Sequence, residues 1–329
     1  MLNPLRQGLR KTMSPTSLAK WGEKILLTED PLEKVQLTLD AGAWWRSASD
    51  LPIGEGTPLD IPPRPSSFNI VSVFKAPRCG KAGSLSSRIT ILHALANVEQ
   101  WAIDTAWDNI VRFGSQPVGA AASPLPRPFY DDFVKMALDE AKHFNWLTKR
   151  LADLNSKFGD LPIHAGIWDS ASGTKHSLPA RMAIVHMVHE ARGLDVNPAT
   201  IANFRKNKDE ASAQMLETIY TDEITHVAIG TRWFKYYCAE HPEVIEAALK
   251  EAAHELKPVT ENGKVEIEDG ATLGLQNYPA AAQYFHLTVH RHFFGKLKPP
   301  FNYSARDEAE LPRDFYEPIA QYPPSPFTP

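Results

Sequence analysis

Apolar residues recur every three to four positions through most of the chain, and strict alternation of apolar and polar residues is almost absent. Apolar residues at i, i+3, i+4 and i+7 are typical of an amphipathic helix, whereas alternation predicts a half-buried strand. The pattern therefore predicts an all-α protein. Four long helices are expected at about 84–112, 128–157, 177–193 and 209–239, with shorter ones within 16–48 and at about 241–256 and 278–295.

Capping and breaking residues mark the boundaries of these helices. Ser177 is a suitable N-cap for the third long helix, and Gly193 is the residue type that commonly ends one. Residues 50–83 are rich in Pro and Gly, which predicts an irregular connector. The link between the second and third long helices, about 158–176, is long enough to run the length of a bundle. Together these features predict a ferritin-like four-helix bundle with a long middle crossover.

Segments on both sides extend the predicted bundle. We expect a single globular unit, since 329 residues can bury a large core. Residues 1–83 would form an N-terminal helical arm and the connector, and 84–240 the bundle. Residues 241–329 would form C-terminal helices and a Pro-rich tail packed on the bundle, with the segment "TENGKVEIEDG" as a turn-rich stretch between two helices.

The composition fits an intracellular protein. Hydrophobic residues make up 43% and charged residues 22%, as in ordinary globular proteins, and no apolar run approaches the roughly 20 residues of a membrane helix. The net charge of −4 gives no overall signal for nucleic-acid binding. Cys79 and Cys238 are too few for a disulfide framework, which favours the cytoplasm. The basic, acid-free first 22 residues match a mitochondrial transit peptide weakly, and a short basic arm is the favoured interpretation.

Each long helix carries one glutamate in the middle of its apolar stripe. These residues are Glu99, Glu140, Glu190 and Glu223. Four unpaired carboxylates in one core would be costly, and burial and repulsion would keep several of them protonated. Two divalent cations carry four positive charges and would balance the four carboxylates. The placement of these glutamates therefore predicts a site for two metal ions.

A five-residue signature, D-E-x-x-H, occurs on two of these helices. It reads Asp139-Glu140-Ala-Lys-His143 and Asp222-Glu223-Ile-Thr-His226. The spacing of three places each Glu and His on one helix face, so both can reach the same ion. Chance predicts about 0.04 occurrences in a chain of this composition. The shorter E-x-x-H pattern means little alone, because Glu251-Ala-Ala-His254 also matches and reads as a solvated face.

These six residues correspond to the ligand set of di-iron carboxylate bundles, in which two helices give one Glu each and two give Glu-x-x-His. By analogy, Glu140 and Glu223 would bridge two iron ions, and manganese also suits the ligand set. Glu99 and Glu190 would be terminal ligands. Metal-bound imidazoles usually donate their other N–H to a carboxylate, so Asp139 and Asp222 would each serve the histidine of the facing helix. The alternative is four buried glutamates in ordinary salt bridges.

Three further features are weaker candidates. His186 lies one turn before Glu190 and could be an extra ligand, although a core histidine with a backbone partner is the favoured interpretation. Tyr220 lies one turn before Glu223 and could be redox-active or a proton donor, with a plain core tyrosine as the alternative. Arg192 and Asp195 would form an ion pair that closes the third helix.

Several motifs resemble those of a ferritin-like family known only as domain of unknown function 455. They are "ILHALANVEQWAID", "DEAKHF", "HEARGLD", "IYTDEITHVAIGTRWF" and "KPPFNYSAR", in the expected order from about residue 16 to 306. The family is placed near the tRNA-modifying di-iron hydroxylases, so the resemblance implies a di-metal bundle but no substrate. Asn97 stands where the pattern suggests His, and the "PPFN" element could cover one end of the bundle.

The sequence thus supports an O2-activating di-iron oxidase or monooxygenase as the first hypothesis. Such an enzyme would need O2, an electron donor such as a ferredoxin or a reductase, and a substrate, either a small molecule or tRNA. The alternatives are a ferroxidase or iron-storage protein and a non-catalytic metal-binding protein. About 80 residues precede the bundle and 90 follow it, enough to build a substrate pocket and to hinder the shell packing that storage requires.

Overall fold

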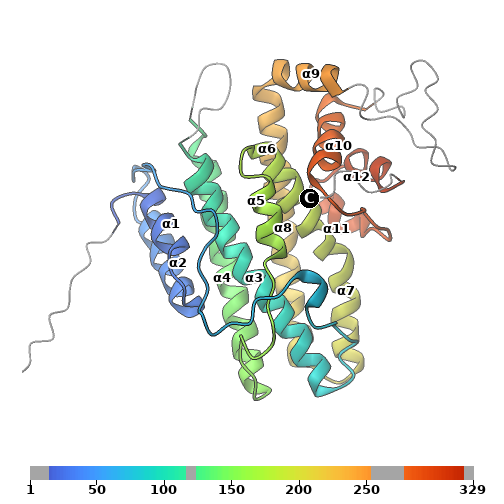
Figure 1. Ribbon diagram of the computed structural model, residues 1–329. Coiled ribbons are helices and arrows are strands. Elements are labelled where there is room, and N and C mark those ends of the chain that lie inside the picture. Colours follow the sequence, from blue (N-terminus) through green and yellow to red (C-terminus); the bar gives the residue numbers. More distant parts are fainter. Residues whose placement is uncertain (1–14, 116–123, 253–277, 322–329) are drawn as a thin grey trace, which may run out of the picture.

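The computed structural model describes residues 15–115, 124–252 and 278–321 (Figure 1). Regular structure in these ranges is helical, with one isolated parallel bridge between Ile70 and Ile163 as the only strand-like pairing. The prediction of an all-α fold is therefore confirmed. Within the described residues, no helix is both long enough and apolar enough to cross a membrane. The segment "TENGKVEIEDG" and His254 lie outside the described residues.

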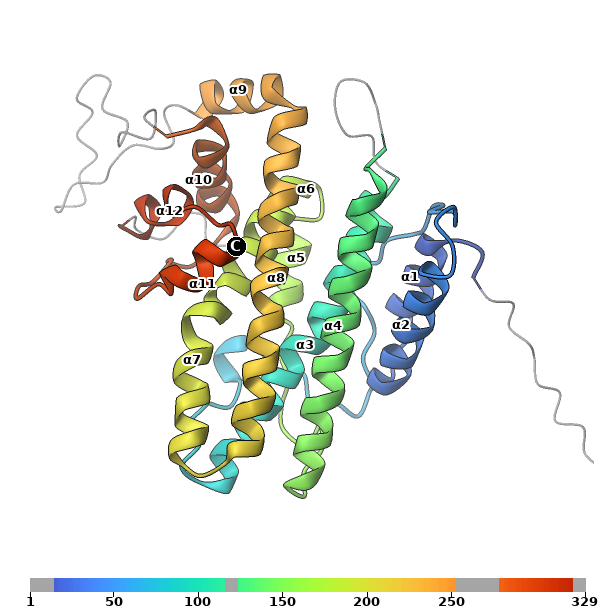
Figure 2. The same ribbon diagram turned by 180° about the vertical axis from the view of Figure 1, so that it is seen from behind.

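Four long helical segments lie side by side and form the bundle (Figures 1 and 2). The first two are α3 (Leu85–Phe113) and α4 (Arg127–Asp153), which pack along each other. The third is continuous and consists of α6 (Leu178–Arg181), the π-helix η2 (Met182–His189) and α7 (Glu190–Lys206). The fourth, α8 (Glu210–Glu240), packs along α7.

Short polar side chains begin these helices as the sequence suggests. The hydroxyl of Ser84 accepts a hydrogen bond from the amide of Ser87, and that of Ser177 from the amide of Ala180. The Asp209 carboxylate accepts one from the amide of Ser212 at the start of α8. Each contact satisfies a backbone donor that has no partner inside its own helix.

The third helix is longer than predicted. It does not stop at Gly193 but runs to Lys206, even though Pro198 lies inside it. Gly193 keeps a helical backbone, and the residue with positive φ that follows the helix is Lys208, at 61°. The prediction of a stop at Gly193 was wrong because a glycine ends a helix only where the chain needs left-handed backbone.

Two N-terminal helices and the connector cover one side of the bundle. Helix α1 (Leu18–Leu26) packs on α3, and α2 (Pro31–Trp45) packs on α4. The connector is irregular, as predicted, apart from the short 3-10 turn η1 (Val73–Lys75). A helix that the sequence did not predict, α5 (Gly166–Gly173), lies in the crossover between α4 and α6 and packs on α3 and η2.

The C-terminal helices lie on the opposite side of the bundle from α1 and α2 (Figure 2). They are α9 (Pro242–Glu251), α10 (Ala280–His292), α11 (Tyr303–Glu308), α12 (Arg313–Tyr316) and the 3-10 turn η5 (Pro318–Gln321). Helix α10 contacts η2, and α11 contacts α7 and α8. One hydrophobic cluster runs from Leu18 to Ile319 and joins all three predicted regions, whose exact limits stay a prediction.

Candidate metal centre

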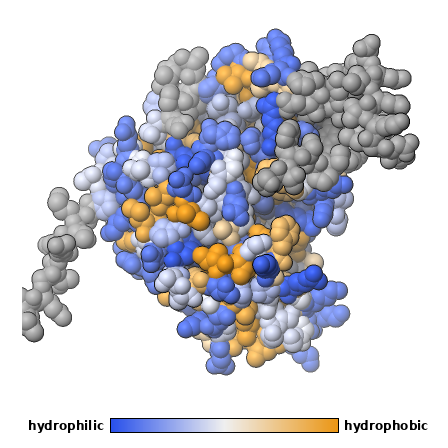
Figure 3. All heavy atoms as spheres, viewed as in Figure 1, coloured by the Kyte–Doolittle hydropathy of each residue, from blue (hydrophilic) through white to orange (hydrophobic). Residues whose placement is uncertain are grey.

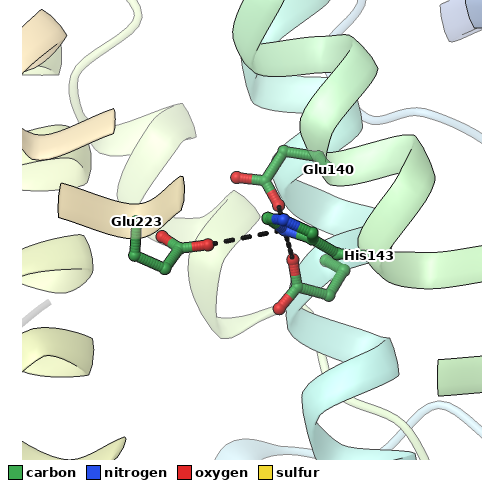
Figure 4. A group of neighbouring side chains, drawn as sticks. Glu140, His143 and Glu223 are labelled. Carbon is green, nitrogen blue, oxygen red and sulfur yellow. Dashed lines mark hydrogen bonds and ion pairs between the residues drawn. The ribbon is translucent and has the colours of Figure 1, made fainter. Parts of the chain in front are cut away.

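Carboxylates and imidazoles from the four long helices meet in the middle of the bundle. Glu99 comes from α3, Glu140 and His143 from α4, and Glu223 from α8. Ligand atoms of these four residues lie within 4.8 Å of one another, and all four residues are buried. Figure 4 shows the carboxylates of Glu140 and Glu223 approaching the ring of His143. This is a group of donor atoms close enough to share one cation.

The two histidines divide the oxygens of Glu140 and Glu223 between them. His143 Nδ1 lies 3.6 Å from Glu140 Oε2 and 3.6 Å from Glu223 Oε1. His226 Nδ1 lies 3.1 Å from Glu140 Oε1 and 3.5 Å from Glu223 Oε2. Each of these two glutamates thus turns one oxygen to each imidazole. A carboxylate placed in this way between two positions can bridge two ions.

The other two glutamates, Glu99 and Glu190, do not lie between the two imidazoles. Glu99 Oε2 lies 3.2 Å from His143 Nδ1. Glu190 is the first residue of α7, immediately after the π-helix, and its carboxylate is buried. It lies outside the four-residue group but borders the same cavity as Glu99, Glu140 and Glu223. The structure therefore brings all four predicted glutamates to one place, with Glu190 at its edge.

The outward nitrogens of both histidines face aspartates of the opposite helix. His143 Nε2, on α4, lies 3.0 Å from Asp222 Oδ2, and His226 Nε2, on α8, lies 3.5 Å from Asp139 Oδ2. Lys142 joins the two aspartates, with its Nζ 3.0 Å from Asp139 and 2.7 Å from Asp222. These contacts fix both rings so that Nδ1 points to the glutamates.

Both aspartates stay ionised. The hydrogen bond with His143 holds the pKa of Asp222 at about 2. Burial alone would raise the pKa of Asp139, but His226, Lys135 and Lys142 outweigh it and hold the pKa well below its usual range. Each ring therefore faces a full negative charge on its outer side, which increases its basicity as a ligand.

The inner groups retain protons in the absence of cations. Burial and the neighbouring Glu140 raise the pKa of Glu99 to about 8, and burial raises the pKa of Glu190 well above its usual value. Burial would lower the pKa of His143, but the surrounding carboxylates raise it to about 11. Protons thus occupy the place that metal ions would take, since metal binding requires deprotonated ligands and releases protons.

Unsatisfied atoms provide a test of whether a metal fits. Glu140 Oε2 and Glu190 Oε2 are buried and form no hydrogen bond with the described residues. Both nitrogens of His226 lie at ion-pair distance from carboxylates but also lack a contact with hydrogen-bond geometry. Buried polar atoms are normally satisfied, and unpartnered ones in a native structure call for an explanation such as an ion. Carboxylate oxygens and imidazole nitrogens together are a suitable ligand set for iron or manganese. The donor set and its unsatisfied atoms therefore fit a bound metal.

His186 positions Glu190 instead of offering a free ligand atom. Its Nδ1 lies 2.7 Å from Glu190 Oε1, and its Nε2 lies 2.8 Å from the amide nitrogen of Asn109. Burial, with the charge of Arg181, lowers the pKa of His186 to about 3, so the ring is neutral. Arg181 donates to the Asn109 oxygen at 3.0 Å, which turns the amide nitrogen of Asn109 toward His186. His186 Nε2 thus accepts, Nδ1–H donates to Glu190, and neither nitrogen remains for a metal.

Helix α8 packs closely on the π-helix at His186. A Cβ atom at Gly230 would lie only 2.4 Å from the Cβ of His186, so only glycine fits there. A π-helix is rare and often marks a functional site. Sequence analysis did not find the π-helix, and it missed Asn109 and Arg181. One of these residues could have been found from the sequence, because Asn109 is a polar residue within the buried face of α3.

Tyr220 contacts the "PPFN" element. The Tyr220 hydroxyl accepts a hydrogen bond of 2.8 Å from the side chain of Asn302, which also donates to the carbonyl of Leu194. The structure thus gives Tyr220 a role in joining α8 to the C-terminal segment, and its catalytic role stays a prediction. Asn302 belongs to "PPFN", so this element holds α7 and α8 together from outside.

Two other predictions can be compared with the structure. The predicted ion pair of Arg192 with Asp195 is present, at 3.7 Å, and Arg306 of the C-terminal segment adds a shorter one to Asp195, at 2.7 Å. Asn97 donates to the carbonyl of His164 at 3.0 Å and holds the crossover. An asparagine at this position therefore serves packing and leaves Glu99 in place.

A cavity of about 260 Å³ opens beside the four glutamates. Apart from these carboxylates, most of its wall is apolar, and it includes Leu95, Val98, Ala102, Ile167, Leu216 and Ile219. Ligand sites are typically concave and mostly apolar with a few polar groups at defined places. The cavity therefore has the character of a small-molecule site that borders the metal centre.

Comparison with known proteins gives a family but no activity. The family described as "Protein of unknown function (DUF455)" matches residues 27–317. A protein of Haemophilus influenzae, described only as uncharacterised, is 38% identical over 143 residues, which are 44% of this chain and 49% of the relative. The chain thus spans about half the length of the curated relative it matches. No solved structure matches.

Proposed function

Because this chain belongs to the DUF455 family, whose description names no activity, we propose its function from the metal centre. The protein is an O2-activating oxidoreductase, an oxidase or a hydroxylase, with two iron or two manganese ions. One observation carries the proposal: Glu140 and Glu223 each turn one oxygen to His143 and the other to His226. Two metal ions that share bridging carboxylates need this arrangement of oxygens.

The chain's own groups would hold the ions and set their surroundings. Glu99 with His143 would serve one ion and Glu190 with His226 the other, between the shared Glu140 and Glu223. Two iron ions would supply the electrons and open coordination positions with which O2 is reduced. Asp139 and Asp222 orient the imidazoles, and His186 orients Glu190. An external donor, a ferredoxin or a reductase, would return the electrons.

The cavity favours an enzyme over the two alternatives. A ferroxidase needs a path for iron ions and no organic binding site, whereas this cavity is largely apolar. A non-catalytic metal site has no need of a cavity against its ligands. The combination of bridging carboxylates with an apolar cavity at the same place supports an organic substrate that meets the ions directly.

Metal loading of the purified protein tests the proposal. We expect two ions of iron or manganese per chain, and fast O2 consumption after anaerobic loading with Fe(II), without growth of a ferric mineral. Glu140→Ala should abolish both, and Glu251→Ala, which removes an exposed glutamate of α9, should change neither. Mineral growth would point to iron storage. Absence of metal uptake would refute a metal-dependent function.

A further inference from the structure

A glycine in the cavity wall has no structural reason to be there. Gly193 lies in α7 (Glu190–Lys206), three residues after Glu190, and lines the cavity. Glycine inside a helix costs about 1 kcal/mol relative to alanine. A Cβ at Gly193 would meet no atom nearer than Asn197 Nδ2, at 3.7 Å, an ordinary contact. Neither the backbone nor the packing therefore requires glycine, and what it provides is open space.

The open space continues toward the surface. Val98 and Val196 are 36% and 38% exposed, and both line the cavity and a neighbouring groove of about 220 Å³. This groove reaches Cys79 and Gly80 in the connector. Figure 3 shows hydrophobic surface near the middle of the face that it views. An elongated apolar molecule could thus extend from the glutamates to the connector.

Positive charge surrounds this opening. The chain has no acidic residue between Asp60 and Glu99, but five basic ones, among them Arg78 and Lys81 on either side of the groove residues Cys79 and Gly80. The described residues 278–306 also contain no acid, although the whole chain has a net charge of −4. Arg78 and Lys81 therefore bring positive charge next to the groove, although the protein as a whole is acidic.

Arg192 brings a positive charge to the cavity itself. It lines the cavity, and its side chain is 47% exposed. One guanidinium nitrogen donates to the carbonyl of Lys298, at 2.9 Å, which places a second basic residue nearby. The acid closest to it, Asp195, is bound by Arg306 at 2.7 Å. Arg192 thus has guanidinium N–H groups and positive charge with which to bind a ligand. A guanidinium group is suited to a carboxylate or a phosphate.

We propose that the cavity binds a small amphiphilic anion, with its hydrocarbon part beside Gly193 and Glu190 and its carboxylate or phosphate group at Arg192. As the substrate class of the oxidoreductase, this inference rests on the proposed function. The hydrocarbon then faces the metal centre, and the positive opening draws the anion in. A small molecule is favoured over a nucleic acid because the site is a narrow apolar cavity and the chain as a whole is acidic.

Calorimetric titration of the metal-loaded protein, kept anaerobic, tests the ligand class. The probes are hexanoate, octanoate and decanoate, with octyl phosphate and uncharged 1-octanol. Each added methylene should tighten binding about fourfold until the cavity is full. Octanoate or octyl phosphate should bind about tenfold more tightly than octanol, and whichever binds better identifies the anionic group. Equal binding of octanol and both anions would refute the role of charge.

Two variants locate the probe. Gly193→Leu should fill the cavity, weaken octanoate binding at least tenfold, and leave the melting temperature and metal content unchanged or higher. Arg192→Gln should weaken octanoate about tenfold but leave octanol binding unchanged. Arg205→Gln is the matched control, because it removes a similarly exposed arginine from the same helix, and it should have no effect.

Several outcomes would overturn the inference. Unchanged octanoate binding in Gly193→Leu would place the probe elsewhere. Binding that requires the metal but not Arg192 would mean that the anion sits on the ions. The protein could instead bind an RNA oligonucleotide tightly. If Arg78→Gln and Lys81→Gln abolished this binding and Gly193→Leu preserved it, the basic residues would serve nucleic-acid binding. If octanoate binds as expected but no O2 is consumed, the proposed function fails and the binding site stands.

Discussion

Helix α3 carries three buried acids that differ in their partners. Asp104 pairs with Lys34 and with Arg64, the latter at 2.6 Å. Asp108 pairs with Arg112 at 2.9 Å and with Arg181 at 2.7 Å. Glu99, on the same helix, has no lysine or arginine partner and lies beside other carboxylates and the ring of His143. The first two acids are matched by permanently charged lysine and arginine side chains, whereas among the described residues the third faces only a histidine, whose charge depends on a bound proton.

The difference separates structural charges from functional ones. A buried carboxylate is tolerable when it is paired and hydrogen-bonded, and it takes up a proton when it is not. Burial and Glu140 raise the pKa of Glu99 to about 8, which is the second outcome. The carboxylates of this site have only protonated histidines beside them, whereas the two other acids of the helix have four lysine and arginine partners. Because a histidine can release its proton and bind a metal ion instead, the site could exchange these protons for metal ions.

The largest expected effect concerns stability without metal. Arg181→Met leaves Asp108 short of a partner in a place with no solvent exposure, so the free energy of unfolding should fall by about 3–5 kcal/mol. Burial would raise the pKa of Glu140, but Glu99 and the two imidazoles outweigh it and keep this carboxylate ionised, so Glu140→Gln should lower that free energy by only about 1 kcal/mol. Urea unfolding after chelator treatment measures both. A large loss in both variants would mean that the two kinds of acid do not differ.

Metal should affect the two variants differently. At a metal concentration 100 times the dissociation constant, the wild type should gain about 2.7 kcal/mol in the free energy of unfolding. Glu140→Gln, which lacks a shared carboxylate, should gain much less, while Arg181→Met should keep most of the gain. An equal gain in Glu140→Gln would exclude that residue as a ligand.

A smaller effect is expected from pH. The folded protein holds the pKa of Glu99 at about 8 and that of His143 at about 11, both above their usual values. A group with a raised pKa in the folded state stabilises it fully below the pKa of the unfolded state, and this contribution is lost as pH rises through the folded pKa. Between pH 7 and 8, where buried histidines with a lowered pKa such as His186 are neutral in both the folded and the unfolded state, the metal-free protein should therefore become less stable.

The metal-loaded protein provides the contrast. Ions displace protons from their ligands, so the stabilisation by metal should grow as pH rises over the same range. Thermal unfolding at pH 5, 6, 7 and 8, with and without Mn(II), measures both slopes. Parallel slopes would contradict competition between protons and ions. Asp139 and Asp222 do not contribute over this range, because their pKa values are held low.

The unmatched acids were visible in the sequence, and the matched ones were not. Glu99, Glu140, Glu190 and Glu223 stand out because a carboxylate within an apolar stripe is an anomaly that needs no tertiary information. Apart from Arg112, which lies one turn from Asp108 on α3, the partners of Asp104 and Asp108 come from distant parts of the chain: Lys34 is 70 residues away from Asp104, and Arg181 is 73 away from Asp108. No helical period can predict such a pairing.

Gly193 and the π-helix show a second limit. Glycine is a residue type that commonly ends helices, which is why a stop was predicted at Gly193. The sequence could not show that the backbone at Gly193 stays helical and that its missing side chain leaves space in a cavity. The π-helix depends on the packing of α8, where Gly230 admits His186. Both features follow from contacts between helices, which the local pattern does not contain.

The two kinds of acid are joined by one chain of hydrogen bonds. Arg181 binds Asp108 and the oxygen of Asn109, Asn109 donates to His186, and His186 donates to Glu190. The ion pair of the matched acid thus also orients a predicted ligand. A positioning role of this kind predicts a modest change in metal affinity, since partners of metal ligands typically contribute tenfold to a hundredfold.

His186→Leu should therefore weaken the binding of one ion about tenfold and leave the other nearly unchanged. Competition titration with a metal-binding dye resolves the two affinities, and His186→Gln, which can still donate to Glu190, should restore part of the loss. His286→Leu is the control: His286 is equally buried and binds the carbonyl of Asp314 at 2.7 Å. It should lower stability by a similar amount without changing either affinity. If both variants lowered the two affinities alike, His186 would be only a structural residue, and Glu190 would not depend on the matched acid.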